Sequence, residues 1–115
     1  MSKREKLRTR LINKTNGHCG YCGCVLFHSG KQWHKWQIDH ILPKKKGGTD
    51  EEDNLMPSCP SCNKYKQVAT LEQFREIVQN TIQVLNKNST AYKVAKRFRL
   101  IEETNDRIVF YFEKI

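Results

Sequence analysis

The sequence has no apolar run that approaches the roughly 18 residues needed to cross a membrane. The charged start from Met1 to Lys6 leads into no apolar core, so no secretion signal is expected. No internal repeat or low-complexity linker interrupts the chain, and acidic residues are scarce, with 12 Asp and Glu against 21 Lys and Arg. These absences argue against membrane insertion and predict one cytoplasmic domain over residues 1–115.

The charge indicates the kind of partner. A net charge of +9 and a pI near 9.5 attract polyanions, of which nucleic acid is the commonest in a cytosol. Anionic lipid is the competing partner, but it needs an amphipathic helix with a broad apolar face. The most basic segment, residues 3–14, offers only Leu7, Leu11 and Ile12. We therefore expect nucleic acid and no membrane.

Capping and apolar spacing predict a helix, a hairpin and a second helix in the first half of the chain. Ser2 and Glu5 form a capping box for a helix over residues 3–15. The segment 32–42 predicts a strand that ends near His40, followed by a lysine loop at 44–48 and a short return segment at 54–56. Pro60 suits the first turn of a helix over 59–66.

The second half of the sequence predicts more helix and a final hairpin. Thr70 and Gln73 form a capping box, and apolar residues recur at a period of 3.6 from Leu71 to Leu85, which predicts one long helix with a core-facing stripe. A shorter helix is expected from Ser89 or Thr90. Alternation over 108–112, with a turn at 104–106, predicts a C-terminal β-hairpin.

Five cysteines cannot all pair in disulfides, and a reducing compartment favours thiolate chemistry instead. Cys19 and Cys22 form one Cys-x-x-Cys pair, and Cys59 and Cys62 form a second after 36 intervening residues. Two such pairs predict a closed structural zinc site, whereas a single pair would fit buried or redox cysteines equally well. We interpret Cys24 as a small buried hydrophobe.

Polar residues lie at defined positions between and beside these cysteine pairs. The segments Ile38-Asp39-His40-Ile41, Asn54-Leu55 and Cys59-Pro60-Ser61-Cys62-Asn63-Lys64-Tyr65-Lys66 together resemble the signature of the HNH (ββα-metal) endonucleases in their zinc-stapled form. The resemblance covers residues 19–66, and Asn63 replaces the final His of the family name, as in HNN variants. It implies a small α+β, treble-clef-like domain with flanking helices and a divalent-metal-dependent endonuclease acting on double-stranded DNA.

The residue chemistry agrees with that resemblance. Phosphodiester hydrolysis needs a base for water and a cation for the charge on phosphorus. We infer that His40 is the base and that Asp39 and Asn63 hold Mg²⁺ or Mn²⁺, because all-oxygen ligands suit hard cations. By resemblance, Asn54 aims His40, the products carry 3′-hydroxyl and 5′-phosphate ends, and partners in phage packaging or restriction are possible. A monomer with one such site is expected to nick.

Other residues have weaker claims to function. Lys44, Lys45, Lys46, Lys64 and Lys66 are candidate DNA contacts, although the 44–46 run could equally be a solvated loop. We interpret His18, His28 and His34 as structural or exposed, and Trp33 and Trp36 as core or hairpin surface.

Two rival functions are carried forward. A non-catalytic zinc module that binds nucleic acid explains the charge and the cysteines but leaves the spacing of Asp39, His40, Asn54 and Asn63 unexplained. A thiol oxidoreductase would need a βαβ context that the sequence lacks.

Overall fold

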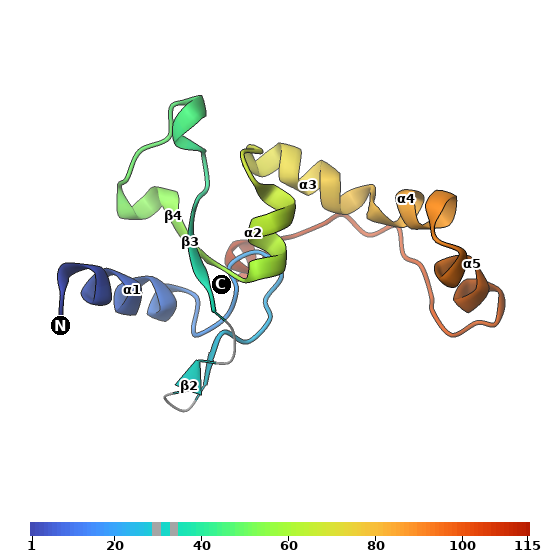
Figure 1. Ribbon diagram of the computed structural model, residues 1–115, viewed down its shortest axis with the longest axis horizontal. Helices are drawn as coiled ribbons and strands as arrows, with labels where there is room; N and C mark the ends of the chain where they lie inside the picture. Colours follow the sequence, from blue (N-terminus) through green and yellow to red (C-terminus); the bar gives the residue numbers. More distant parts are fainter. Residues whose placement is uncertain (29–30, 33–34) are drawn as a thin grey trace.

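A computed structural model describes the backbone of residues 1–28, 31–32 and 35–115, and the side chains outside 28–34. The molecule is elongated, with extents of 52 × 36 × 22 Å. Figure 1 shows helix α1 (Lys3–Lys14) at one end, the strands β3 (Gln37–His40) and β4 (Leu55–Ser58) with α2 (Pro60–Lys66) at the centre, and helices α4 (Thr81–Asn88) and α5 (Thr90–Arg97) at the other end. Trp33, His34 and the side chain of His28, for which the sequence predicts structural or exposed positions, lie outside the described residues.

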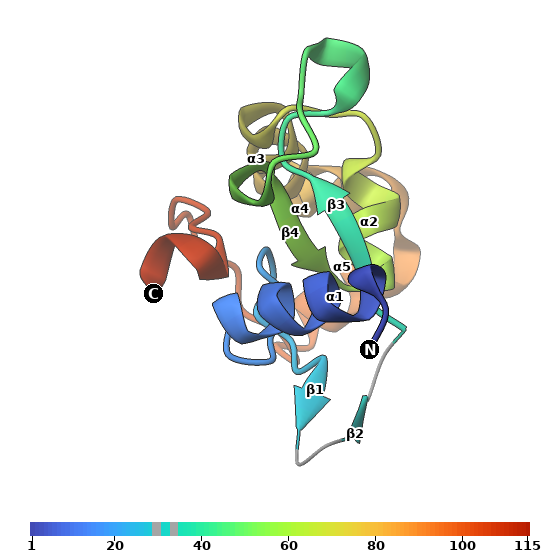
Figure 2. The same cartoon turned by 90° about the vertical axis from the view of Figure 1, so that its left-hand side faces the viewer.

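The central unit is a two-stranded antiparallel sheet followed by a helix (Figure 2). Strand β3 pairs with β4 in the register Asp39 opposite Met56 and His40 opposite Leu55. The chain then enters α2 at Pro60, whose fixed φ suits a first helical position. This ββα unit confirms the α+β class and the predicted hairpin and helix.

The connection between β3 and β4 is a loop with two short 3₁₀ turns, at Lys44–Lys46 and Glu52–Asn54. The predicted lysine loop is therefore partly helical. A second small hairpin, β1 (Phe27–His28) with β2 (Lys31–Gln32), precedes β3.

Helix α1 forms as predicted, with the Ser2 side chain accepting a hydrogen bond from the backbone of Glu5. Leu11 and Ile12 are buried and anchor its C-terminal half in the core. The helix therefore presents its basic N-terminal half to solvent while its other end is fixed. The core consists of Leu11, Ile12, Cys19, Tyr21, Leu26, Trp36, Leu55, Met56, Cys59, Phe74 and Phe110.

The single long helix predicted over 71–85 is wrong. Helix α3 (Leu71–Gln79) begins at the predicted Thr70 capping box but ends before Asn80, and α4 starts at Thr81. The Thr81 hydroxyl donates to the carbonyl of Ile77, a bond that bends helices, and Asn80 has weak helix propensity. Of the predicted apolar stripe, Phe74 is buried in the core and Leu71 and Val78 pack against it, whereas Ile77 is exposed.

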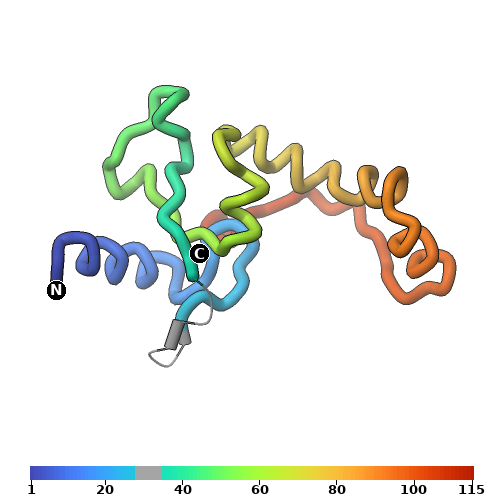
Figure 3. Tube along the Cα trace, viewed as in Figure 1, coloured from blue at the N-terminus to red at the C-terminus, as the bar shows by residue number. Residues whose placement is uncertain are grey.

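The predicted C-terminal β-hairpin is also wrong. Over residues 100–110 the chain runs back from α5 toward the centre of the molecule (Figure 3) and ends in a 3₁₀ turn at Tyr111–Lys114. Its backbone N–H groups find other partners, because Tyr111 donates to the carbonyl of Tyr21 and Phe112 to that of Gly20. The alternating apolar residues serve to bury Phe110 against Tyr21 and Phe74.

The short helix predicted from Ser89 or Thr90 is confirmed as α5, which Ser89 caps by accepting from the backbone of Tyr92. Within the described ranges, every helix is too short or too polar to span a membrane.

Candidate functional site

Three of the four predicted zinc ligands, Cys19, Cys22 and Cys59, meet where the Cys19 loop touches the start of α2. The sulfur atoms of Cys19, Cys22, Cys24 and Cys59 all lie within 4.8 Å of one another. The backbone N–H of Cys59 donates to Cys19 Sγ and that of Cys62 donates to Cys59 Sγ, both at 3.3 Å. Such N–H donation stabilises thiolates, so the cluster is positioned to hold a structural zinc ion.

The thiols also perturb one another. The pKa of Cys62 is raised by the adjacent Cys19 and Cys22 thiols, and the pKa of Cys19 is lowered by Cys22 and Cys62. Four thiolates this close repel strongly unless a cation lies between them, which is the chemistry of a zinc site. The four sulfur atoms that lie within 4.8 Å of one another include that of Cys24 and not that of Cys62, which was predicted as the fourth zinc ligand.

The interpretation of Cys24 as a buried hydrophobe is corrected. Its side chain is half-buried and its sulfur lies among those of Cys19, Cys22 and Cys59. The Gly23 backbone, at φ +80°, turns the chain back so that the Cys24 carbonyl accepts from the Cys19 N–H at 2.8 Å. The same turn that shapes the knuckle therefore brings the fifth cysteine to it.

Strand β3 sends Asp39 toward the interior. The Asp39 carboxylate is 7% exposed, and its Oδ2 accepts from the Tyr21 hydroxyl at 2.5 Å and lies 3.0 Å from the Lys66 ammonium. Burial, followed by the Asp39 charge, raises the pKa of Tyr21, so the phenol stays protonated and donates. Tyr21 and Lys66 both contact the same carboxylate oxygen, Oδ2.

Asn63 lies on the face of α2 that is turned toward β3. Its amide nitrogen donates to Gln37 Oε1 at 2.5 Å. Gln37 and Asp39 share one face of β3, and Asn63 and Lys66 share one face of α2, since they are two and three residues apart respectively. The contacts Gln37–Asn63 and Asp39–Lys66 therefore place the predicted ligands Asp39 and Asn63 on the facing surfaces of β3 and α2.

His40 points to the other side of β3. Its Nε2 lies 2.8 Å from Asp50 Oδ1, and the second Asp50 oxygen accepts from Lys44 at 2.8 Å. Hydrogen bonds from Lys44 and then from His40 lower the pKa of Asp50. Sequence reasoning missed Asp50; the only signal was its place in the loop that joins His40 to Asn54.

Asn54 closes that loop. Its Oδ1 accepts from the backbone of Leu42 at 2.9 Å, and its amide nitrogen donates to the carbonyls of Leu42 and Thr49. Gly48 lies so close that an added Cβ would meet the Leu42 carbonyl oxygen at 1.7 Å. The loop thus holds its end near His40 in one conformation.

A groove of about 640 Å³ opens beside His40, between α1 and β3. Arg4, Arg8, His40 and Asp50 are among its lining residues. The Arg8 guanidinium stacks 3.7 Å from the ring of Trp36, which is buried as predicted. The basic α1 helix therefore faces the same opening as the candidate base.

The candidate DNA-contacting lysines differ in their exposure and in their contacts. The side chain of Lys66 is fully buried and donates a hydrogen bond to the His40 carbonyl at 2.9 Å. It supports the site from the interior, so the prediction that Lys66 contacts DNA is wrong. Lys44 pairs with Asp50, and Lys46 donates to Gln73. Lys45 and Lys64 are exposed. His18 stacks on Tyr111, away from the groove, which fits its interpretation as structural.

The central unit therefore consists of two antiparallel strands and a helix, with a cysteine cluster at the start of the helix. Residues 19–68 match the model of the HNH endonuclease family. No curated protein matches the chain.

The cysteine geometry predicts one tightly held zinc ion per chain. We expect Cys59→Ser and Cys62→Ser to lose zinc and to melt at lower temperature, because structural zinc binding is largely folding free energy. Cys24→Ser should keep zinc, since Cys19-x-x-Cys22 and Cys59-x-x-Cys62 already supply four thiolates. Elemental analysis and thermal denaturation measure both effects. Zinc retained in Cys62→Ser but lost in Cys24→Ser would make Cys24 the fourth ligand.

Proposed function

We propose that the protein is a divalent-metal-dependent DNA endonuclease that nicks duplex DNA and leaves 3′-hydroxyl and 5′-phosphate ends. The observation that carries this proposal is the divergence of two neighbouring side chains on β3. Asp39 faces α2, where it contacts Lys66, whereas His40 faces the arginine-lined groove. A phosphate placed at the end of β3 would therefore have a metal site on one side and a base on the other.

The donors at the end of β3 fit a hard divalent cation. Asp39 Oδ1 and the Asn63 carbonyl oxygen would hold it, because the Asp39 Oδ2 is occupied by Tyr21 and Lys66 and the Asn63 nitrogen by Gln37. Carboxylate and amide oxygens favour Mg²⁺ or Mn²⁺ over softer metals. When bound, such an ion supplies charge stabilisation at the phosphoryl and leaving oxygens.

Asp50 defines which nitrogen of His40 acts as the base. An ionised carboxylate only accepts hydrogen bonds, so the His40 Nε2 that contacts Asp50 must carry the proton. In the neutral imidazole this leaves Nδ1 unprotonated and able to accept a proton from water. Asp50 is thus a positioning residue for His40, and Asn54 holds the loop that presents both.

The reaction follows from these roles. Arg4 and Arg8 bind phosphates of the backbone in the groove, and His40 Nδ1 removes a proton from water as its oxygen bonds to phosphorus. The bond from phosphorus to O3′ breaks, and O3′ takes up a proton from solvent. One such motif per chain cuts one strand per encounter.

Supercoiled plasmid tests the function directly. Wild-type protein with Mg²⁺ or Mn²⁺ should convert it to the open-circular form, and His40→Ala should lower this rate about 10²–10⁴-fold while retaining the fold and DNA binding. His18→Ala is the matched control, because it removes an imidazole outside the groove. DNA binding without any cleavage by wild type would favour the non-catalytic zinc module.

The contact between Asp50 and His40 generates a second prediction. Asp50→Ala should lower kcat about 10–100-fold, because His40 loses its orientation and tautomer preference. Asp50→Glu should recover part of the loss. Asp53→Ala removes the same charge from an exposed position in the same loop and should leave kcat unchanged.

The protonation site of the His40 ring provides a second readout, because it would not change if Asp50 had only a structural role. In ¹⁵N NMR spectra, His40 should be protonated at Nε2 in wild type and in Asp53→Ala but lose that preference in Asp50→Ala. Equal kcat values for Asp50→Ala and Asp53→Ala would remove Asp50 from the mechanism.

A further inference from the structure

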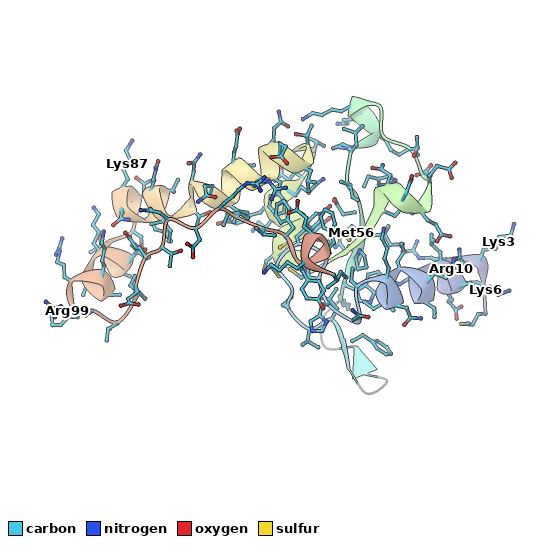
Figure 4. The ribbon with its side chains drawn as sticks, turned by 180° about the vertical axis from the view of Figure 1, so that it is seen from behind. Lys3, Lys6, Arg10, Met56, Lys87 and Arg99 are labelled. Carbon is cyan, nitrogen blue, oxygen red and sulfur yellow. The ribbon has the colours of Figure 1, made fainter. Side chains whose placement is uncertain are left out.

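A second basic surface lies at the end of the molecule farthest from α1. Residues 81–100, which form α4, α5 and the turn after them, contain five Lys and Arg residues and no Asp or Glu. Figure 4 shows Lys87 and Arg99 at this end and Lys3, Lys6 and Arg10 at the opposite end of the long axis. We call residues 81–100 the basic lobe.

The lobe contains a hollow of about 390 Å³ between α4 and α5, lined by Asn86, Lys93, Lys96 and Arg97. Three cations and one amide line it. Lys93, Lys96 and Arg97 are spaced three and four residues apart, so they lie on one face of α5. Like charges at this spacing destabilise a helix unless an anion lies among them.

The contacts around the hollow show which of its groups remain to bind an anion. The Lys96 ammonium is held by Asn86 Oδ1 at 3.1 Å and by Glu103 at 3.2 Å. Among the described residues, no carboxylate forms an ion pair with Lys93 or Arg97. Arg97 is exposed, and a guanidinium can bind a phosphate through two parallel hydrogen bonds.

We propose that the hollow in the basic lobe binds the phosphodiester backbone of DNA and is a second DNA contact, separate from the catalytic motif. This inference rests on DNA being the substrate of the proposed nuclease. The 52 Å length of the molecule matches about 15 base pairs at 3.4 Å each. A duplex along this axis would span α1 at one end of the molecule and α4 and α5 at the other (Figure 1), and would pass the groove beside His40. Backbone contacts at both ends fix its position without reading sequence.

The double variant Lys93→Gln with Arg97→Gln tests the site. Its affinity for a duplex of about 24 base pairs is measured by fluorescence anisotropy over a range of salt, with no divalent metal added, so the result does not depend on cleavage. We expect Kd to rise about tenfold, and the slope of log K against log salt to fall by about two, one for each lost phosphate contact.

The control is Arg107→Gln with Lys114→Gln, which removes the same charge from exposed positions in the C-terminal segment. The control should change Kd less than about twofold. Equal losses in the two double variants would show that only net charge matters and would overturn the proposal. Circular dichroism checks that α5 persists, which is expected because the substitutions remove like-charge repulsion.

Two further measurements separate the alternatives. If the protein cleaves, the lobe variant should lower kcat/KM on the long duplex but not on one of about 8 base pairs, which cannot reach both the groove and the lobe. Lobe-dependent binding to phosphatidylserine vesicles, with DNA binding unchanged, would contradict the proposal and indicate a lipid surface around the exposed Phe98 and Leu100.

Discussion

The cysteine cluster is the constraint on which the rest of the site depends. Four closely spaced thiolates are stable only around a cation, and the cluster joins the Cys19 loop to the first turn of α2. Asn63 follows Cys62 directly, so fixing the start of α2 also fixes Asn63. Tyr21, inside the same loop, is held where its hydroxyl reaches Asp39. A zinc ion in this cluster would therefore position Asn63, one proposed metal ligand, and Tyr21, which supports the other, Asp39.

Because successive side chains of a strand point to opposite faces, β3 places Asp39 and His40 on different sides. Asp39 is buried with Lys66 and Tyr21, and this pairing stabilises a carboxylate that would otherwise be costly to bury. His40 points into a groove beside α1 and is paired with Asp50. The Lys66 ammonium contacts both the Asp39 carboxylate and the His40 carbonyl, and so links the two halves of the site from within.

Short sequence patterns correctly predicted the features that depend only on residues close together in the chain. The caps at Ser2 and Thr70 and Pro60 at the start of α2 each act within a few residues, and the structure contains them. Of the two Cys-x-x-Cys motifs, Cys19, Cys22 and Cys59 enter the cluster, together with Cys24. The prediction of a C-terminal hairpin failed because Phe110, one of the alternating apolar residues, packs on Tyr21, which lies about 90 residues away in the sequence. Asp50 and the buried position of Lys66 were missed for the same reason, since both depend on how the loop and α2 meet β3.

Binding of Mn²⁺ tests most directly whether Asp39 and Asn63 form one metal site. Zinc-loaded protein is titrated with Mn²⁺ and followed by electron paramagnetic resonance, a measurement that needs no DNA and no cleavage. Wild type should bind one Mn²⁺ per chain, Asp39→Asn and Asn63→Ala should each bind it at least about tenfold more weakly, and Lys64→Ala, one residue away on α2, should match wild type. Wild-type affinity in Asn63→Ala would show that Asp39 and Asn63 do not share a metal, and the proposed site would be wrong.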